Sequence, residues 1–499
     1  MRMLRALKGL NPASWSASGK RTGIDVALTA VFVALVVIAN VILYSVCTIH
    51  SLYFWVDDDA VYRIGEGSER YLEKINPEGK DITIHFCMPQ DEINKNRAYL
   101  RVYETAMQFA EKYEYFHVDN VNIHTDYALV KEWSEKNKTE ISSYSVVFTS
   151  GEESYVAAMD TFYVYQEKDN AARMEFNGEE TVVTVANYVL HGAKSRPTAM
   201  MTTGHAEAAT FSLYNLLTSA GYNIGDVDLL SEEIPEECSL LVISNPTSDF
   251  SKYSTEGSVV QFVSEIDKLE AFLARGGTLL VLRSPDKRNS LANLDALLEK
   301  HGLITDSDSV VEDVQNGVGT SGQLLLADFA SGGDAARIGE RVRAHNASRV
   351  ITGKASPIRF GETAAHTEVF PLILSSDTAV EVKAEERLAE GNYALVAVSR
   401  TEYANGSSSH LILSSSADIA SYDMMETEGY ANEELLYAIL EAYDGVTVPI
   451  GCNLITLNAY PVENLTLGET NLYLILLMGV LPVTVAALGV VICRRRKYR

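Results

Sequence analysis

The chain has 499 residues and a formal net charge of −26, from 67 acidic and 41 basic residues. A chain with this excess of negative charge repels the phosphates of nucleic acids and anionic lipids and will not bind them nonspecifically. We therefore expect no nucleic-acid partner. Its length is too great for one hydrophobic core, and we therefore expect two or more domains.

The first distinctive element is an uncharged apolar segment at residues 26–47. As a helix it would be ~33 Å long, enough to cross a hydrocarbon core of about 30 Å. We therefore predict a basic tail over 1–23 and a transmembrane helix over 24–49. Cys47 ends a stretch that weakly resembles a lipoprotein cleavage box, but Val46 stands where such a box has a small residue. An uncleaved anchor is the preferred interpretation.

Residues 50–192 are predicted to form a first extracytoplasmic α/β domain. Alternating, β-rich runs predict strands, and an apolar stripe at helical spacing predicts a helix between them. The strands are expected at 81–89, 121–126 and 144–150, and the helix at 96–113. This order is loosely that of a thioredoxin fold. The C-x-x-C that redox chemistry needs is missing, and Cys87 is predicted to be a small buried residue.

Residues 193–445 are predicted to form a second domain, in which apolar strands alternate with helices. This alternation is typical of a doubly wound, mostly parallel sheet with right-handed crossovers. Strands are expected at 198–203, 223–230, 238–244, 278–284, 392–400 and 410–416. Helices are expected at 207–220, 254–275, 290–302 and 432–443. Gly221 and the Gly276-Gly277 pair follow two of these helices, as C-terminal glycines commonly do.

A second uncharged apolar segment at 472–493 follows a predicted linker over 446–470. We predict a transmembrane helix over 471–493 and a basic tail over 494–499. Basic residues flank both apolar segments on their outer sides, so the positive-inside rule predicts two cytoplasmic termini and a large extracytoplasmic domain. The expected fold class is α/β, with two transmembrane helices flanking a multi-domain ectodomain. The expected location is the cell membrane, and the scarcity of cysteine favours a bacterial cell envelope.

The candidate binding site lies at the exits of the predicted strands. In an open α/β sheet, ligands bind at the carboxyl ends of the strands. The candidate residues for binding a ligand or partner are Gly204, His205, Glu207, Asn245, Asp286 and Asp418. We expect them to border one polar cleft.

His205 and Glu207 admit several interpretations: a catalytic base with its partner, two metal ligands, ligand contacts, or a structural loop. A catalytic zinc takes three protein ligands, and the sequence requires no third one here. Hydrolysis needs a nucleophile on a sharp strand-to-helix turn, and no such motif follows the strand at 238–244. The structural loop is preferred, with Glu207 near the start of the next helix and His205 hydrogen-bonded across the loop. We therefore predict no catalytic residue, no metal and no cofactor.

Five features in one order resemble the gliding-motility-type auxiliary component (GldG family) of ABC transport systems. They are residues 176–190, 202–207, 221–246 and 269–286, and the final apolar segment followed by "RRRKYR". Where the family tends to show G-H-G-E, this chain has Gly204-His205-Ala206-Glu207. The resemblance implies a glutaminase-like α/β domain on the outer face, associated with a separate ABC ATPase and a multispan permease.

The expected function follows from this resemblance and from two absences in the sequence. The chain has no G-x-x-x-x-G-K-[ST] loop, so it is not the ATP-hydrolysing subunit, and two spans are too few for a permeating pore. We expect a non-catalytic, membrane-anchored auxiliary subunit that couples the ATPase and permease to a surface ligand or partner. The alternative is an envelope hydrolase or ligand-binding protein that uses a cleft around His205 and Glu207.

Overall fold

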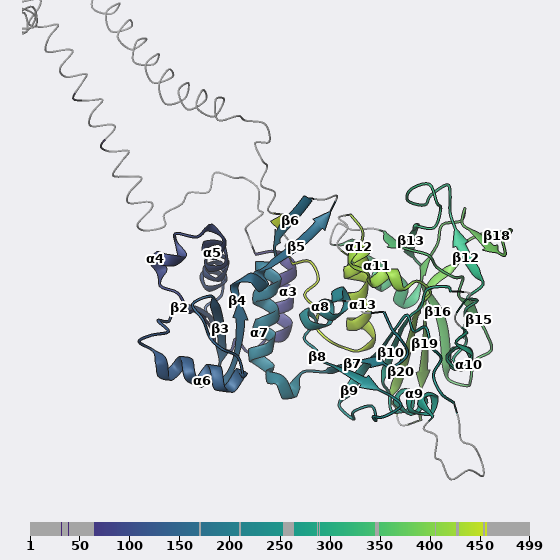
Figure 1. The fold of residues 1–499 in the computed structure, drawn as a ribbon, viewed down its shortest axis with the longest axis horizontal. Coiled ribbons are helices and arrows are strands. Elements are labelled where there is room, and N and C mark those ends of the chain that lie inside the picture. The colour runs from purple at the N-terminus through teal and green to yellow at the C-terminus, as the bar shows by residue number, and fades with distance from the viewer. Residues whose placement is uncertain are drawn as a thin grey trace, which may run out of the picture.

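The structure is a computed structural model, and it describes most of the chain between residues 64 and 456. The described residues are 31, 38, 64–168, 171–208, 211–252, 264–286, 288, 290–344, 349–404, 406–425, 429–452 and 455–456. They form a mixed α/β protein with several sheets. Two domains with separate cores lie side by side in Figure 1.

The predicted membrane topology is corrected by the structure. Among the described residues, no helix is both long and apolar enough to cross a membrane. The longest of them, α7 (Gly178–Ser195), has Glu179 and Glu180 in its first turn and is kinked at Gly192. The predicted spans at 26–47 and 472–493 lie outside the described residues, apart from residues 31 and 38. The fold class with two transmembrane helices and the two-span membrane location are therefore not supported.

The N-terminal domain is built on a four-stranded sheet in the order β2-β1-β3-β4. Its strands are β1 (Ile82–Phe86), β2 (Phe116–Asn120), β3 (Ser145–Ser150) and β4 (Glu153–Ala158). Its helices are α3 (Glu66–Ile75), α4 (Gln90–Ile93), α5 (Arg97–Lys112), α6 (Tyr127–Asn137), η4 (Met159–Phe162) and α7. β1 and β2 are parallel because α5 crosses over between them, whereas β3 is antiparallel to β1 and β4.

Local sequence patterns explain these elements. Alternate residues of β1 are buried, as expected for a strand with one face on a core. In α5, Val102, Ala106 and Phe109 form a buried stripe at helical spacing that packs in the N-terminal core. The Asn96 side chain caps α5 by accepting a hydrogen bond from the backbone N–H of Ala98.

A small three-stranded sheet returns the end of the described chain to the N-terminal domain. It contains β5 (Tyr163–Lys168), β6 (Ala171–Phe176) and β21 (Ile455–Thr456), in the order β21-β6-β5. β21 pairs with β6 in the antiparallel sense, so a segment from beyond the second domain contacts the first.

The second domain is built on a nine-stranded sheet in the order β14-β13-β16-β19-β20-β10-β9-β7-β8. Its strands are β7 (Thr198–Thr203), β8 (Asn223–Asp228), β9 (Cys238–Ser244), β10 (Thr278–Leu282), β13 (Leu325–Phe329), β14 (Val350–Thr352), β16 (Thr367–Leu374), β19 (Ala394–Glu402) and β20 (Ser408–Ser414). β8, β7, β9, β10 and β20 run parallel, but every pairing from β20 to β14 is antiparallel. The expectation of a mostly parallel sheet therefore holds for only one half, because β19 and β20 form a hairpin with a short connection.

Helices cover both faces of this sheet, as Figure 1 shows. α8 (Phe211–Ser219), α11 (Gly333–Arg343) and α13 (Asn432–Tyr443) contribute to one core, and α9 (Glu265–Ala274) and α10 (Ala292–Lys300) to the other. Shorter elements complete the domain: β11 (Leu303–Ile304), β12 (Ser309–Glu312), β15 (Arg359–Phe360), β17 (Val380–Lys383), β18 (Glu386–Glu390), η5 (Ala417–Ala420) and α12 (Tyr422–Met425). Because β7, β9, β10 and β20 are parallel, the loops that follow them meet at one edge.

Candidate functional site

The loop after β7 has a tightly bent backbone. Gly204 has a φ of 105° and Ala206 a φ of 51°. Positive φ is readily adopted by glycine and is strained for alanine. The glycine that the resembling family tends to show at position 206 would therefore suit this backbone better than the alanine present here.

The His205 side chain is buried between two carboxylates. Its Nδ1 lies 3.5 Å from Glu207 Oε1, and its Nε2 lies 3.2 Å from Glu265 Oε2. The imidazole stacks on Phe250 with ring centroids 3.9 Å apart. The three polar side chains are 4%, 9% and 1% exposed. The imidazole is therefore closed off from solvent and from any ligand in solution.

This arrangement does not fit a metal site. The two carboxylates face opposite nitrogens of the His205 ring, so one ion cannot contact all three groups. In the part of the chain that the structure describes, no group of three or more His, Cys, Asp or Glu side chains is arranged to hold a metal ion. The geometry is that of a buried ion-pair triad.

The triad connects the loop after β7 to the loop after β9. The His205 carbonyl accepts hydrogen bonds from the backbone N–H groups of Thr247 and Ser248, at 2.9 and 3.1 Å. Glu265 Oε2 accepts another from Ser251 N–H at 2.7 Å, and Glu207 Oε2 accepts one from the N–H of His205 at 2.8 Å. His205 therefore positions the residues that border the neighbouring cavity without lining it.

The triad predicts a pH dependence of stability. Burial alone would lower the pKa of His205, but the carboxylates of Glu207 and Glu265, one beside each ring nitrogen, outweigh burial and raise it. A raised pKa in the folded state gives stability that is fully present below the unfolded pKa of about 6.5 and is lost as the pH rises through the folded pKa. Urea unfolding at a series of pH values should show the wild-type advantage over His205→Gln shrinking across that range.

No other titratable group discussed here makes the stability difference between wild type and His205→Gln shrink as the pH rises. Burial would raise the pKa of Glu207, but its hydrogen bonds with His205 lower it overall, so its contribution disappears only as the pH falls through that lowered pKa. His85, His301 and His410 have lowered pKa values, mainly through burial, but they are present in both proteins and cancel. A difference between wild type and His205→Gln that is constant with pH would contradict the charged triad.

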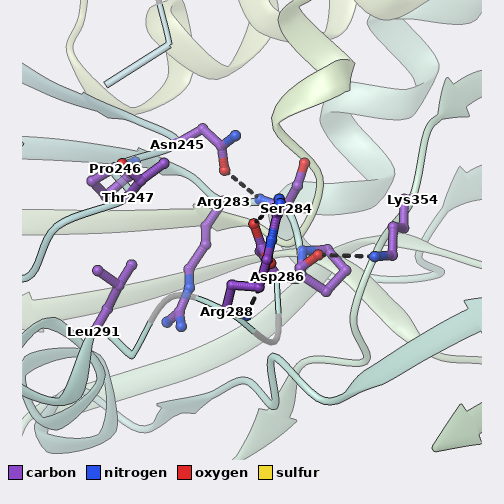
Figure 2. Close-up of a pocket in the computed structure, with 10 residues that line it drawn as sticks. Asn245, Pro246, Thr247, Arg283, Ser284, Asp286, Arg288, Leu291 and Lys354 are labelled. Atoms are coloured by element: carbon purple, nitrogen blue, oxygen red, sulfur yellow. Dashed lines mark hydrogen bonds and ion pairs between the residues drawn. The ribbon is translucent and has the colours of Figure 1, made fainter. Parts of the chain in front are cut away.

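A cavity of about 490 Å³ opens beside this loop, where β9 and β10 end (Figure 2). It is lined by Asn245, Pro246, Thr247, Arg283, Ser284, Pro285, Asp286, Arg288, Leu291 and Lys354. Asn245 has a φ of 47°, and its Oδ1 accepts a hydrogen bond from the N–H of Ser284 at 3.0 Å. The sharp turn after β9 is thus held to the end of β10 by an amide side chain.

Basic side chains dominate the charged lining of the cavity. Arg283 is 6% exposed and is paired with Asp295. Arg288 lies 2.9 Å from Asp286 Oδ2, and its hydrogen bonds hold the pKa of Asp286 at about 2. The ammonium of Lys354 donates to the carbonyl of Pro285 at 3.1 Å, as Figure 2 shows. The lining therefore contains three cations and one carboxylate, Asp286, and Arg283 is paired with Asp295 outside the lining.

The six sequence-predicted residues do not form one cleft. Asn245 and Asp286 line the cavity, while His205 and Glu207 are buried behind it. Gly204 lies beside Asp228. Asp418 packs against Gly353, and burial raises its pKa although the backbone of Lys354 hydrogen-bonds to it. Asp418 therefore does not line the cavity itself. It contacts the backbone segment that carries Lys354, and Lys354 lines the cavity.

Three basic residues of the cavity were missed by sequence reasoning. Arg283 and Arg288 flank Asp286 in "RSPDKR", so a local basic run was available as a signal. Lys354 comes from the segment between β14 and β15, and nothing in its local pattern associates it with β10.

The chain matches no family model and no curated protein. Several solved structures are similar to it at low identity, and those described next cover about half of this chain. The N-terminal domain of mmIFT52 is 14% identical, with a TM-score of 0.37, over 50% of this chain and 97% of that chain. A cytoplasmic protein from Salmonella typhimurium is 12% identical, with a TM-score of 0.31, over 50% and 98%. A glutamine amidotransferase from Thermotoga maritima is 12% identical, with a TM-score of 0.26, over 50% and 98%. Similarity at these TM-scores carries no argument about function, and the GldG resemblance stays a prediction.

Proposed function

We propose that the chain is a non-catalytic auxiliary subunit of an ABC transport system. Its second domain recognises an anionic group, on a surface ligand or on a partner protein, in the cavity at the ends of β9 and β10. The observation that carries this proposal is the charge of the lining, which contains three cations, Arg283, Arg288 and Lys354, and one carboxylate, Asp286. Arg283 pairs with Asp295 and Arg288 with Asp286, whereas Lys354 donates to the carbonyl of Pro285. In a chain with a net charge of −26, such a local positive site attracts anions.

The size of the cavity supports recognition of an organic group. A volume of about 490 Å³ falls within the roughly 300–1,000 Å³ that is usual for ligand pockets. Arginine and lysine side chains are common donors to carboxylate and phosphate oxygens. An acidic side chain of a docked segment, or a small organic acid, has the chemistry that this lining recognises.

The turn after β9 supports a role without catalysis. A strained turn at a strand end is where α/β-hydrolases carry their nucleophile. Here that turn carries Asn245, whose amide is not a nucleophile and accepts the N–H of Ser284. His205, the candidate base, faces a carboxylate at each ring nitrogen and stacks on Phe250. The geometry therefore does not favour a hydrolase built on His205 and Glu207.

The association with an ABC transporter rests on the resemblance of five ordered features to the GldG family. The absence of a phosphate-binding G-x-x-x-x-G-K-[ST] loop from the sequence is consistent with a subunit that relies on a separate ATPase.

Affinity purification of the full-length chain, followed by mass spectrometry, tests this proposal. We expect an ABC ATPase and a multispan permease to copurify with the wild type. If the partner carries the anionic group, Lys354→Glu should recover them roughly tenfold less, because a hydrogen bond to a charged group is worth about 1.5–3 kcal/mol.

The matched control is Lys131→Glu, which reverses an exposed lysine on α6, outside the cavity. It should recover both subunits as the wild type does. Equal recovery with Lys354→Glu would place the anionic group on a separate ligand. A preparation with neither ATPase nor permease would contradict the transporter association.

A further inference from the structure

One wall of the cavity at the ends of β9 and β10 is the segment that follows β9. The first three residues of this cavity wall (residues 245–251) line the cavity, as Figure 2 shows. The backbone of the wall is bonded to the loop after β7, because the N–H groups of Thr247 and Ser248 donate to the carbonyl of His205. The position of the wall therefore depends on where that loop holds His205.

The cavity wall is also bonded to the start of α9. The N–H of Ser251 donates to Glu265 Oε2 at 2.7 Å, and the N–H of Glu265 donates to the Ser251 hydroxyl at 3.3 Å. The N–H of Ile266 donates to the carbonyl of Ser251 at 3.2 Å. The same Oε2 of Glu265 lies 3.2 Å from His205 Nε2. Glu265 therefore connects the imidazole to the far end of the wall.

The two carboxylates of the triad require a donor at each ring nitrogen of His205. A protonated imidazole carries an N–H on both nitrogens, whereas a neutral one carries a single N–H and a lone pair. Glu207 Oε1 lies 3.5 Å from Nδ1 and Glu265 Oε2 lies 3.2 Å from Nε2, and both side chains are buried. When the imidazole is neutral, one buried carboxylate therefore faces a lone pair, which is unfavourable without a replacement donor.

Other charged groups on the elements around His205 are occupied elsewhere. Asp228, at the end of β8, accepts hydrogen bonds from its own turn. Asp249, in the cavity wall, accepts hydrogen bonds from the backbone at the start of α10. Lys268 of α9 pairs with Glu233. Among the described residues, the two carboxylates of the triad are thus the charged groups that face the ring.

We propose that the triad is a pH-sensitive switch of the cavity, which holds residues 245–251 in the binding shape while His205 is protonated and releases them when it loses that proton. A shift of Glu265 away from the lone pair breaks its bond with Ser251. A shift of Glu207 breaks its bond with the N–H of His205, whose carbonyl holds the wall. Because the pKa of His205 is raised, the release occurs above the ordinary imidazole value of about 6.5.

The switch goes beyond the proposed function, which concerns only what the cavity binds. Its effect on affinity rests on that proposal, because a released wall weakens binding only of a ligand that the cavity takes. The release of the wall is measurable without any ligand, so the switch and the proposed function can fail separately.

Hydrogen exchange of the full-length chain, followed by mass spectrometry between about pH 6 and 9, tests the switch. Protection factors, corrected for the intrinsic pH dependence of exchange, remove the chemical effect of pH. We expect the protection of residues 245–251 to fall about fivefold or more as the pH rises, the lower end of common coupling between two sites. The protection of β10 should stay constant.

Glu207→Gln gives the sharpest test, because its amide satisfies a neutral imidazole. The amide oxygen replaces Oε2 and accepts the N–H of His205, and the NH₂ group replaces Oε1 and donates to Nδ1. His205 Nε2 then keeps its proton for Glu265. We expect this variant to retain the protection of residues 245–251 at high pH. His205→Gln, if folded by circular dichroism, should show low protection at every pH.

The matched control is His366→Gln, which removes an exposed histidine of the same domain outside the cavity lining. It should show the same fall in protection as the wild type. Succinate binding, measured by calorimetry, is the second readout, because its carboxylates stay ionised over this range. The affinity for succinate should fall with rising pH in the wild type and in the control, but not in Glu207→Gln.

Protection of residues 245–251 that is constant with pH in the wild type would overturn the switch. An equal fall in Glu207→Gln would overturn it too, because the release would then have another cause. Succinate affinity that ignores the fall in protection would show that the wall does not set the binding shape, which also overturns the inference. The expected protection changes without succinate binding at any pH would support the switch and argue against a small organic acid as the ligand.

Discussion

Replacing His205 with alanine is expected to lower the free energy of unfolding of the second domain by about 3–5 kcal/mol, the usual result of breaking a buried ion pair. The substitution leaves Glu207 and Glu265 facing each other without the imidazole between them. Their side chains are only 9% and 1% exposed, so water cannot replace the lost partner. The stacking contact with Phe250 is lost as well. Urea unfolding, followed with a probe of the second domain, measures the change.

The matched control for this prediction is His117→Ala in the N-terminal domain. His117 lies 3.3 Å from Asp81, but the two side chains are 51% and 80% exposed. Exposed pairs of this kind contribute about 0–1 kcal/mol. A similarly small effect of His205→Ala would show that the two glutamates are neutral or otherwise paired in the folded protein, against the charged triad described above.

Replacing Gly67 with alanine is expected to destabilise the contact between the two domains. A Cβ at Gly67 would lie 2.7 Å from the carbonyl oxygen of Ile450 and closer still to that of Gly451. Backbone atoms cannot rotate away, so α3 must shift, and overpacking of this kind costs about 1–3 kcal/mol. Glycine to alanine within a helix would otherwise stabilise α3 by about 1 kcal/mol. The expected sign is therefore opposite to helix propensity.

Thermal unfolding together with limited proteolysis at the junction checks this prediction. We expect a lower Tm for Gly67→Ala and faster cleavage between the domains. Gly391→Ala is the control, because a Cβ there meets nothing within 4 Å. A Gly67→Ala protein that is more stable than the wild type would mean that helix propensity prevails and that α3 does not pack closely on the segment at 450–451.

Local patterns in the sequence predicted many of the described elements. The apolar runs that became β9 and β10 were visible because a strand buried on both faces is apolar along its whole length. The apolar stripe of α5 was visible because burial on one face of a helix imposes a period of 3.6 residues. Gly221, predicted to follow a helix, has a φ of 89° just after α8. The rule for strand ends also brought Asn245 and Asp286 to the same edge of the sheet. The predicted spans at 26–47 and 472–493 are not supported, because no helix among the described residues could cross a membrane, and apart from residues 31 and 38 those segments lie outside the described residues.

The sequence by itself thus determined the mixed α/β composition, the approximate positions of many strands and helices, and two residues of the cavity. Only the tertiary structure decided which half of the large sheet is antiparallel, because apolar runs buried on both faces look alike in either direction. It also decided that His205 lies buried between Glu207 and Glu265, and that Lys354 joins the cavity at β10. The physical reason is common to these cases. A local pattern specifies which face of an element is apolar, whereas the partner of a charged side chain depends on segments far apart in the chain.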